Sequence, residues 1–297
     1  MKRVVSISLG SSTRDHKAEQ EFGGQLISIE RIGTDGDKEK AINIIRSLDG
    51  SVDAFGLGGT DLYIYAGKKR YTFRESAKIA AAARVTPVVD GSGIKNTLER
   101  QVVTYLKQQG YTFEGQKVLV VCAVDRFGLA EALAGAGAET IYGDLLYGLG
   151  LPFPVRSLDT LAAIARLVAP VITKLPIRMF YPTGESQNQI QPRYEKYFYD
   201  ADVIAGDFHF IRRYMPDKLT GKLIITNTVT REDVNLLRER GVSTLVTTTP
   251  AIAGRTFGTN IMEAVLVALG GGRQLSPEEY SSMLNEIQIC PQIRKLS

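Results

Sequence analysis

Hydrophobic and polar positions between residues 117 and 270 repeat in a way that predicts strands and helices in turn. Residues 117–121 (KVLVV) form a continuous β-branched run, which is typical of a strand buried on both faces. Strand–helix alternation with short loops requires parallel strands and right-handed crossovers, so we expect a Rossmann-like doubly wound parallel sheet. The other strands are expected at 140–142, 177–181, 202–205, 222–226 and 243–247, and the helices at 127–137, 157–173 and 230–240.

The first half of the chain is less regular, but its pattern also predicts α/β structure. A length of 297 residues favours two domains. We place the boundary near residue 112, between an N-terminal α/β substrate domain (1–111) and a Rossmann-like nucleotide-binding domain with C-terminal helices (112–297). In the first domain we expect strands at 3–8, 25–31, 52–57 and 85–89, a hairpin at 62–73, and helices at 37–48, 74–83 and 96–109.

Charge and composition restrict the partners. The 36 Lys and Arg against 32 Asp and Glu give a net charge of +4, which permits a small anionic substrate and is too small to indicate nucleic acid. No stretch approaches the ~18–20 apolar residues of a membrane span, so we expect a cytoplasmic protein with no membrane partner. Two cysteines and two histidines predict reduced thiols and argue against a zinc site, so we expect no metal, while a carboxylate-bound Mg²⁺ site stays open. The sequence also allows the protein to form a homodimer.

The turn after the first strand of the second domain is the main cofactor candidate. Its residues, Ala123, Val124, Asp125, Arg126, Phe127 and Gly128, stand where a dinucleotide fingerprint has Gly-x-Gly-x-x-Gly, and only the last glycine is kept. Asp144 follows Ala123 by 21 residues (144 − 123), where an acid binds a ribose hydroxyl and favours NAD over NADP. The alternatives are a sheet that has lost the cofactor or one that holds another anionic ligand.

Other strand ends of this domain carry polar side chains that we expect near the same cleft. Ligands of such sheets bind beyond the carboxyl ends of the strands, at the point where the strand order reverses. His209 follows the strand at 202–205 and is a candidate proton relay, although it could equally lie exposed on the next helix. Thr247, Thr248 and Thr249 end the strand at 243–247 and are candidate cofactor contacts, but threonines also simply favour strands.

Three loops of the first domain are candidates for substrate binding. Residues 10–16 gather Ser11, Ser12, Arg14 and His16, which suit a carboxylate or phosphate. Gly59, Thr60 and Asp61 lie in a glycine-rich loop that a ligand can approach closely. In residues 90–97, Asp90 and Lys95 form a candidate donor–acceptor pair facing an interdomain cleft. Each loop can also be a tight turn with its caps. The loop at 183–187 is a weaker candidate.

The segment from Asp90 to Ala132 runs through a strand, an Asp-Gly…Asn-Thr loop, a long helix, the strand in 115–121 (GQKVLVV) and a turn. It resembles the junction in shikimate and quinate dehydrogenases where a catalytic domain meets a nicotinamide-binding domain. Most of the chain also resembles a bacterial family that carries the name quinate 5-dehydrogenase, on residues 32–37 (IGTDGD), 52–56 (VDAFG) and 254–260 (GRTFGTN).

The resemblance implies an NAD-dependent oxidoreductase that transfers hydride from a polyol or hydroxy acid such as quinate in an interdomain cleft. No segment matches the Asn-Val-Thr-x-Pro-x-Lys motif that supplies the catalytic lysine of shikimate-type enzymes, so by position Asp90 and Lys95 replace the acid–base pair, with His209 as the other relay. Two further functions stay open: a nucleotide-using enzyme of another class, such as a ligase or transferase, and a non-catalytic sensor of a nucleotide or sugar acid.

Overall fold

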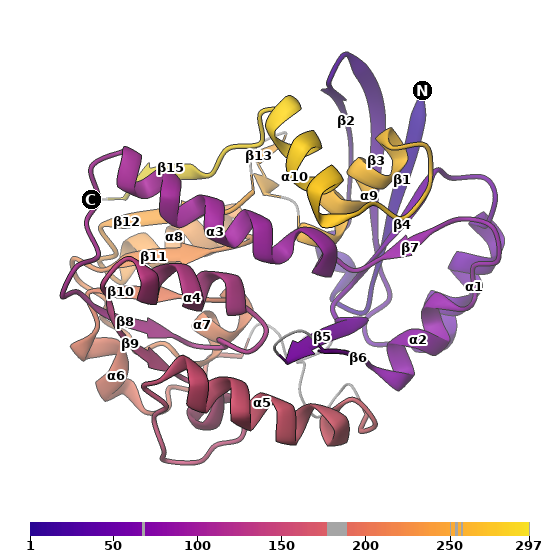
Figure 1. Ribbon diagram of the computed structural model, residues 1–297. Helices are drawn as coiled ribbons and strands as arrows, with labels where there is room; N and C mark the ends of the chain where they lie inside the picture. The colour runs from indigo at the N-terminus through magenta and orange to yellow at the C-terminus, as the bar shows by residue number, and fades with distance from the viewer. Residues whose placement is uncertain (67–68, 177–188, 250, 253–254, 257, 297) are drawn as a thin grey trace. The chain divides into compact units, whose positions relative to one another are not determined.

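The computed structural model describes residues 1–66, 69–176, 189–249, 251–252, 255–256 and 258–296 (Figure 1). The chain is α/β throughout and divides into two compact units. Unit 1 comprises residues 1–94, 168–187 and 257–289, and unit 2 comprises 95–167, 188–256 and 290–297. The units therefore divide at the start of the helix at 92–108, whereas the expected boundary near 112 lies beyond its end.

Unit 2 is built on a six-stranded sheet in the order β15-β12-β11-β10-β8-β9. Neighbouring strands from β9 to β12 are parallel, and only β15 runs antiparallel, at the edge. This confirms the doubly wound, mostly parallel sheet that the sequence predicts. The strands are β8 (Lys117–Val120), β9 (Glu139–Tyr142), β10 (Val203–Ala205), β11 (Leu223–Thr226), β12 (Thr244–Thr247) and β15 (Gln292–Lys295).

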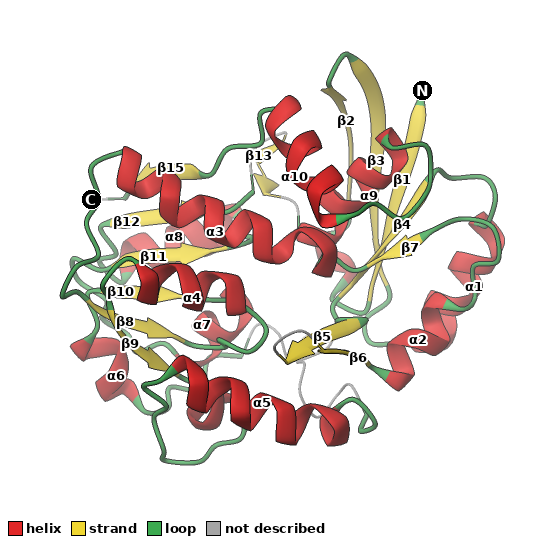
Figure 2. Cartoon of the chain, in the orientation of Figure 1, coloured by secondary structure: helices red, strands yellow, loops and turns green. Residues whose placement is uncertain are grey.

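Helices cover both faces of this sheet because successive residues of its strands point to opposite sides. On one face Val118 and Val120 pack with side chains of α3, α4 and α5. On the other face Leu119 and Val121 pack with side chains of α6, α7 and α8. The helices are α3 (Ser92–Gln108), α4 (Phe127–Gly135), α5 (Leu158–Ile172), α6 (Glu195–Asp200), α7 (Phe208–Tyr214) and α8 (Arg231–Glu239), with a π-turn η2 (Asp144–Gly148) and a small β13–β14 hairpin (Ala251–Ile252, Arg255–Thr256) (Figure 2).

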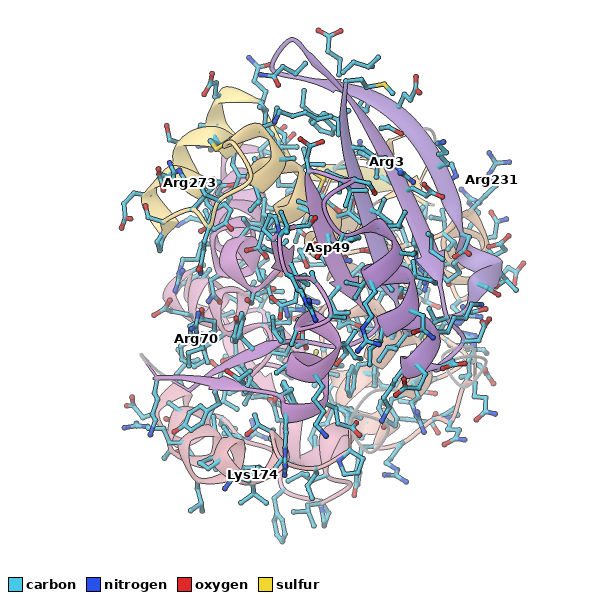
Figure 3. The ribbon with its side chains drawn as sticks, turned by 90° about the vertical axis from the view of Figure 1, so that its right-hand side faces the viewer. Arg3, Asp49, Arg70, Lys174, Arg231 and Arg273 are labelled. Carbon is cyan, nitrogen blue, oxygen red and sulfur yellow. The ribbon has the colours of Figure 1, made fainter. Side chains whose placement is uncertain are left out.

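Unit 1 holds a five-stranded sheet in the order β2-β3-β1-β4-β7. All its neighbours are parallel except β2, which pairs antiparallel with β3. Asp49, which is labelled in Figure 3, follows the last residue of α1 and accepts hydrogen bonds from the backbone N–H groups of residues 84–86. The elements are β1 (Lys2–Ser8), η1 (Ser12–Arg14), β2 (His16–Phe22), β3 (Gln25–Gly33), α1 (Lys38–Leu48), β4 (Ala54–Gly58), β5 (Tyr63–Ala66), β6 (Lys69–Thr72), α2 (Arg74–Ala80), β7 (Val88–Val89), α9 (Thr259–Leu269) and α10 (Pro277–Glu286).

Helix α9 returns to unit 1 and packs on β1 and β4. Every residue from Ile261 to Ala268 is buried. Asn260 Nδ2 donates to Ser6 Oγ at 2.8 Å, which joins positions 254 residues apart. Gly56 permits this approach, because a Cβ there would lie 2.9 Å from the backbone oxygen of Asn260. The helices α1 and α2 contribute Ala41, Ile45 and Ile79 to a separate core with β1 and β4.

Most expected elements of the described residues are present, and the differences have local causes. The hairpin at 62–73 is confirmed as β5–β6, while its turn at Gly67 lies outside the described residues, as do the expected strand at 177–181 and the loop at 183–187. The strand expected at 85–89 shrinks to β7 because Asp49 binds the backbone of residues 84–86. The strands β2 and β15 are edge strands that the sequence analysis does not predict.

Candidate functional site

The carboxyl ends of β8 and β10 lie side by side in unit 2, because these two strands are paired in parallel. The chain crosses from β8 outward to β9, while β10, β11 and β12 extend the sheet the other way. This is the point where the strand order reverses, and ligands of open α/β sheets bind there. The turn at 122–128 and the segment 206–209 meet at this point, as the sequence predicts.

Arg126 is the centre of a buried ionic cluster at this edge. Its guanidinium donates to Glu99 Oε1 at 3.0 Å and to Asp207 Oδ2 at 2.9 Å, and its Nε lies 3.3 Å from Asp125 Oδ2. The side chain of Arg126 is 6 % exposed and that of Glu99 is 2 % exposed. Buried charges are tolerated only when they are paired, so this cluster fixes the turn after β8 against α3 and the end of β10.

The first turns of α3 add a second cation and two helix caps. Lys95 Nζ donates to Asp125 Oδ1 at 2.7 Å. Asn96 Oδ1 accepts from the backbone N–H of Gly128 at 3.1 Å, and Glu99 Oε2 accepts from that of Leu129 at 3.3 Å. Side chains of α3 therefore satisfy N–H groups at the start of α4, which are the donors that hold a pyrophosphate in dinucleotide-binding sheets.

Asp144 satisfies the other donors of the same turn. Its carboxylate accepts from the backbone N–H of Ala123 at 3.0 Å and from that of Val124 at 2.9 Å. Burial raises the pKa of Asp144 to about 6, although these two hydrogen bonds lower it. The role of Asp144 opposite a ribose stays a prediction. What the structure describes is a carboxylate that already lies in the anion-binding turn.

Burial and charge act in opposite directions on the acids of the cluster. Burial raises the pKa of Glu99 to about 7, in spite of Arg126 and Lys95. Burial also raises the pKa of Asp207, but Arg126, His209 and Asn227 outweigh it and lower the value to about 2. For Asp125, Lys95 and Arg126 together outweigh burial and lower the pKa. At neutral pH, Asp125 and Asp207 are therefore the ionised partners of the two cations.

The ends of β10, β11 and β12 carry further polar groups. Asp207 accepts from Asn227 Nδ2 at 2.8 Å and from the backbone N–H of His209 at 2.9 Å, so His209 lies in the first turn of α7 at the expected edge. Thr247 and Thr249 donate their hydroxyls to backbone oxygens of Thr249 and Asn227. His209, Thr247 and Thr249 thus all form hydrogen bonds within the protein.

Two hydroxyls at this edge differ from the others. Thr248 Oγ1 and Thr228 Oγ1 are buried and have no hydrogen-bond partner within the described ranges. Thr248 follows β12 directly and is only 3 % exposed, and Thr228 lies two residues beyond β11, which pairs with β12. Buried hydroxyls in proteins nearly always have a partner, so each one without a partner needs an explanation.

The candidate substrate loops of unit 1 are closed by their own hydrogen bonds. Ser11 Oγ accepts from the backbone N–H of Thr13, and the backbone N–H of Ser12 donates to Asp35 Oδ1. Thr60 and Ser76 share a hydrogen bond of 2.9 Å between their hydroxyls. Gly59 adopts φ +69°, and a Cβ there would lie 2.7 Å from the backbone nitrogen of Gly10, so these two loops pack together. Arg14 belongs to η1, His16 begins β2 and Asp61 is buried beside Thr60.

Asp90 and Lys95, expected as a donor–acceptor pair, belong to different units and have separate partners. Asp90 accepts from the backbone N–H groups of Leu62, Tyr63 and Ser92, whereas Lys95 is paired with Asp125. Asp90 therefore anchors the start of the β5–β6 hairpin. Their predicted catalytic role stays a prediction.

A second buried carboxylate, Glu263 of α9, lies close to Asp90 in unit 1. Its oxygens accept from the backbone N–H of Gly91 at 2.6 Å and from the hydroxyl of Tyr280 at 2.8 Å. Burial and the neighbouring Asp90 raise the pKa of Glu263 to about 7. The sequence analysis misses Glu263 and Tyr280, which lie far from Asp90 along the chain.

The sequence analysis also misses Glu99, Asp207, Asn227 and Thr228. One signal was present: Lys95 and Glu99 are four residues apart on one helix, so they share a face and can reach the same turn.

This geometry defines a two-unit α/β protein with a doubly wound sheet in one unit. Residues 93–296 match the family described as a domain of unknown function (DUF8754), and the chain belongs to that family. Residues 3–90 match a second domain of unknown function (DUF8753). No curated protein matches the chain.

Solved structures match over most of the chain at low identity. A galactofuranose binding protein is 13% identical, with 97% of this chain and 99% of that chain covered and a TM-score of 0.38. The periplasmic binding protein of the arabinose ABC transporter from Shewanella sp. ANA-3 is 12% identical over 97% and 96%, with a TM-score of 0.37. The NAD-dependent malic enzyme from Thermotoga maritima is 13% identical over 97% and 84%, with a TM-score of 0.34.

Three further findings concern the described part of the chain. None of its helices combines the length and apolar character that crossing a membrane requires. No group of three or more His, Cys, Asp or Glu side chains in it could hold a metal ion. Both cysteines are free thiols, Cys122 buried beside Asp207 and Cys290 exposed.

Proposed function

We propose that this protein binds a small, uncharged, polyhydroxylated molecule of the polyol or sugar type at the carboxyl edge of β10–β12, as a binding or sensor protein. The observation that carries the proposal is the pair of buried hydroxyls of Thr228 and Thr248 that have no partner among the described residues. An unpaired buried hydroxyl costs roughly 1–3 kcal/mol, and a hydroxyl of a bound molecule would supply the missing partner.

The charges near this edge favour an uncharged ligand over the anionic one that the sequence analysis expects. Lys95 and Arg126 already have carboxylate partners, so neither cation is left to balance a further anion. A free anion such as quinate would lie among these carboxylates without a cation to pair with. The groups concerned are Glu99, Asp125, Asp144 and Asp207 against Lys95 and Arg126.

A nicotinamide-dependent oxidoreductase acting on a polyol or hydroxy acid is the second candidate. The parallel sheet with its strand reversal between β8 and β10 favours it, since dinucleotides bind at such a point. The turn itself does not fit a pyrophosphate, because Ala123, Val124, Gly128 and Leu129 already donate their N–H groups within the chain. The binding proposal is therefore the better supported, and a nucleotide-using enzyme of another class meets the same obstacle.

The experiment compares ligand-induced thermal stabilisation of the wild type and of Thr248→Val. A ligand at 100 times its Kd stabilises the native state by about 2.7 kcal/mol. We expect a shift with at least one uncharged polyol or sugar, from a panel of myo-inositol, sorbitol, glucose and arabinose, and none with NAD, NADP or ADP. A shift with NAD alone would support the oxidoreductase instead.

Thr248→Val separates ligand binding from a purely structural role. The variant replaces an unpaired buried hydroxyl by a methyl group of similar size, so without ligand it should be as stable as the wild type or more stable. Its ligand-induced shift should be lost. Thr247→Val is the control: it removes the hydrogen bond to the backbone oxygen of Thr249, so it should lower the stability and keep the ligand shift. Loss of stability in Thr248→Val with an unchanged shift would contradict the proposal.

A further inference from the structure

We infer that Asp144 is a specificity-determining residue that excludes phosphate-bearing ligands from the carboxyl edge of unit 2, by placing its own carboxylate in the anion-binding turn after β8. The inference deepens the proposed function and rests on it, because it states which ligands this edge rejects. It also explains why a sheet with the topology of dinucleotide-binding proteins has a turn that does not fit a pyrophosphate.

The turn has the geometry of an anion site, and an anion occupies it. The N–H groups of Ala123 and Val124 are consecutive, and they converge on one carboxylate with distances of 3.0 Å and 2.9 Å. Consecutive backbone N–H groups of this kind form concave sites that bind phosphates in many proteins. Here the occupant comes from the first residue of η2, directly beyond β9. A phosphate can use these donors only after displacing Asp144.

The neighbouring N–H donors at the start of α4 are also occupied, so a phosphate cannot bind to them instead. Gly128 and Leu129, in the first turn of α4, donate to Asn96 and Glu99 of α3. A Cβ on Gly128 would lie 2.7 Å from the backbone oxygen of Asn96, so the two helices are in close contact at this point. The retained glycine of the degraded fingerprint thus serves helix packing, and Asp144 is the occupant of the N–H groups of Ala123 and Val124.

The cations beside the turn do not offset the carboxylate of Asp144. Lys95 and Arg126 are engaged with Asp125, Glu99 and Asp207. The charges that act on the turn therefore repel a second anion while Asp144 is ionised. Removing the carboxylate leaves two N–H donors directed at a position where an anion fits.

The test measures binding of inorganic pyrophosphate and of ADP by isothermal titration calorimetry to the wild type, Asp144→Ser and Asp144→Asn. The serine removes charge and volume, and the asparagine removes charge alone and serves if the serine variant does not fold. We expect Asp144→Ser to bind pyrophosphate at least tenfold more tightly than the wild type, with Asp144→Asn between them. Asp202→Ser is the matched control, since Asp202 also accepts a backbone N–H, from Lys117 at the opposite end of β8. It should leave pyrophosphate binding unchanged.

Two results would overturn the inference: tight binding of pyrophosphate by the wild type, or folded Asp144 variants that bind it no better than the wild type. Failure of the proposed function looks different. In that case uncharged polyols and sugars give no thermal shift with the wild type, whatever the Asp144 variants do with pyrophosphate. The two measurements use different ligands, so each proposal can fail alone.

Discussion

Glu99 in unit 2 and Glu263 in unit 1 are both buried, both accept an N–H at or near the start of a helix, and burial raises the pKa of each to about 7. Their surroundings differ. Glu99 is paired with the guanidinium of Arg126 at 3.0 Å, whereas Glu263 accepts from neutral donors and lies near another carboxylate, Asp90. Similar pKa values therefore arise in a charge-balanced cluster and in one that relies on neutral hydrogen bonds.

The largest expected effect comes from removing the cation of the balanced cluster. Arg126→Met leaves the carboxylates of Glu99, Asp125 and Asp207 without their shared partner, and breaking a buried ion pair in this way costs about 3–5 kcal/mol. Urea unfolding at neutral pH measures the loss. In the control Arg100→Met, an exposed pair with Glu131 is broken, and the cost should stay below about 1 kcal/mol. Equal losses in the two variants would show that the cluster is not charge-balanced as described.

The next effect tests the neutral donors around Glu263. Tyr280→Phe removes the hydroxyl that donates to Glu263 Oε1 at 2.8 Å. Hydrogen bonds to charged groups contribute roughly 1.5–3 kcal/mol, so the cost should approach that range when Glu263 is ionised. Tyr199→Phe is the control, because Tyr199 donates to Glu195 on the exposed surface, where the cost should be near zero.

This effect has a defined pH dependence. The pKa of Glu263 is about 7, above its ordinary value of 4.5. The folded protein therefore binds this proton more tightly than the unfolded chain, and the resulting stability is complete below pH 4.5 and lost as the pH rises to 7. Tyr280→Phe raises the pKa of Glu263 further, so in this variant the loss should continue above pH 7. A cost that does not change with pH would mean that Glu263 does not titrate in this window.

The smallest expected effect comes from Gly128, which allows α3 and α4 to pack closely beside the charge-balanced cluster around Arg126. Gly128→Ala places a Cβ 2.7 Å from the backbone oxygen of Asn96 and pushes Glu99 away from α4. Overpacking of this kind costs about 1–3 kcal/mol. Gly135→Ala, in the same helix and with no atom within 4 Å of the added Cβ, should be neutral or slightly stabilising. If the two alanines behave alike, close packing of α3 on α4 does not hold the cluster.

The sequence predicts the second unit well because its signals are local. Its buried strands are short β-branched runs, and α8 begins with a capping box of Thr230 and Asp233. The candidate site is harder to predict. Ala123, Asp125, Arg126, Asp144 and His209 lie at the expected edge, since the sheet topology fixes where strand ends meet.

What the sequence analysis misses depends on contacts between distant segments. Whether Asp144 faces a ligand or the turn is decided by side-chain orientation, which no spacing reveals. The pairing of Glu99 with Arg126 joins α3 to a turn 27 residues away, and that of Glu263 with Gly91 spans 172 residues. The loops of unit 1 illustrate the same point, because their hydroxyls suit a ligand in sequence, whereas in the structure they form hydrogen bonds with other hydroxyls of unit 1.

The return of α9 to unit 1 has a consequence for the order of events during synthesis. The strands β1 and β4 are made first, yet the helix that packs on them begins at Thr259, and Asn260 bonds to Ser6. A ribosome must therefore translate nearly the whole chain before unit 1 can close. Until then, one apolar side of its sheet stays exposed to water and to other nascent chains. The strands that precede α9 thus complete their packing late, and truncation before α9 should leave them dependent on chaperones.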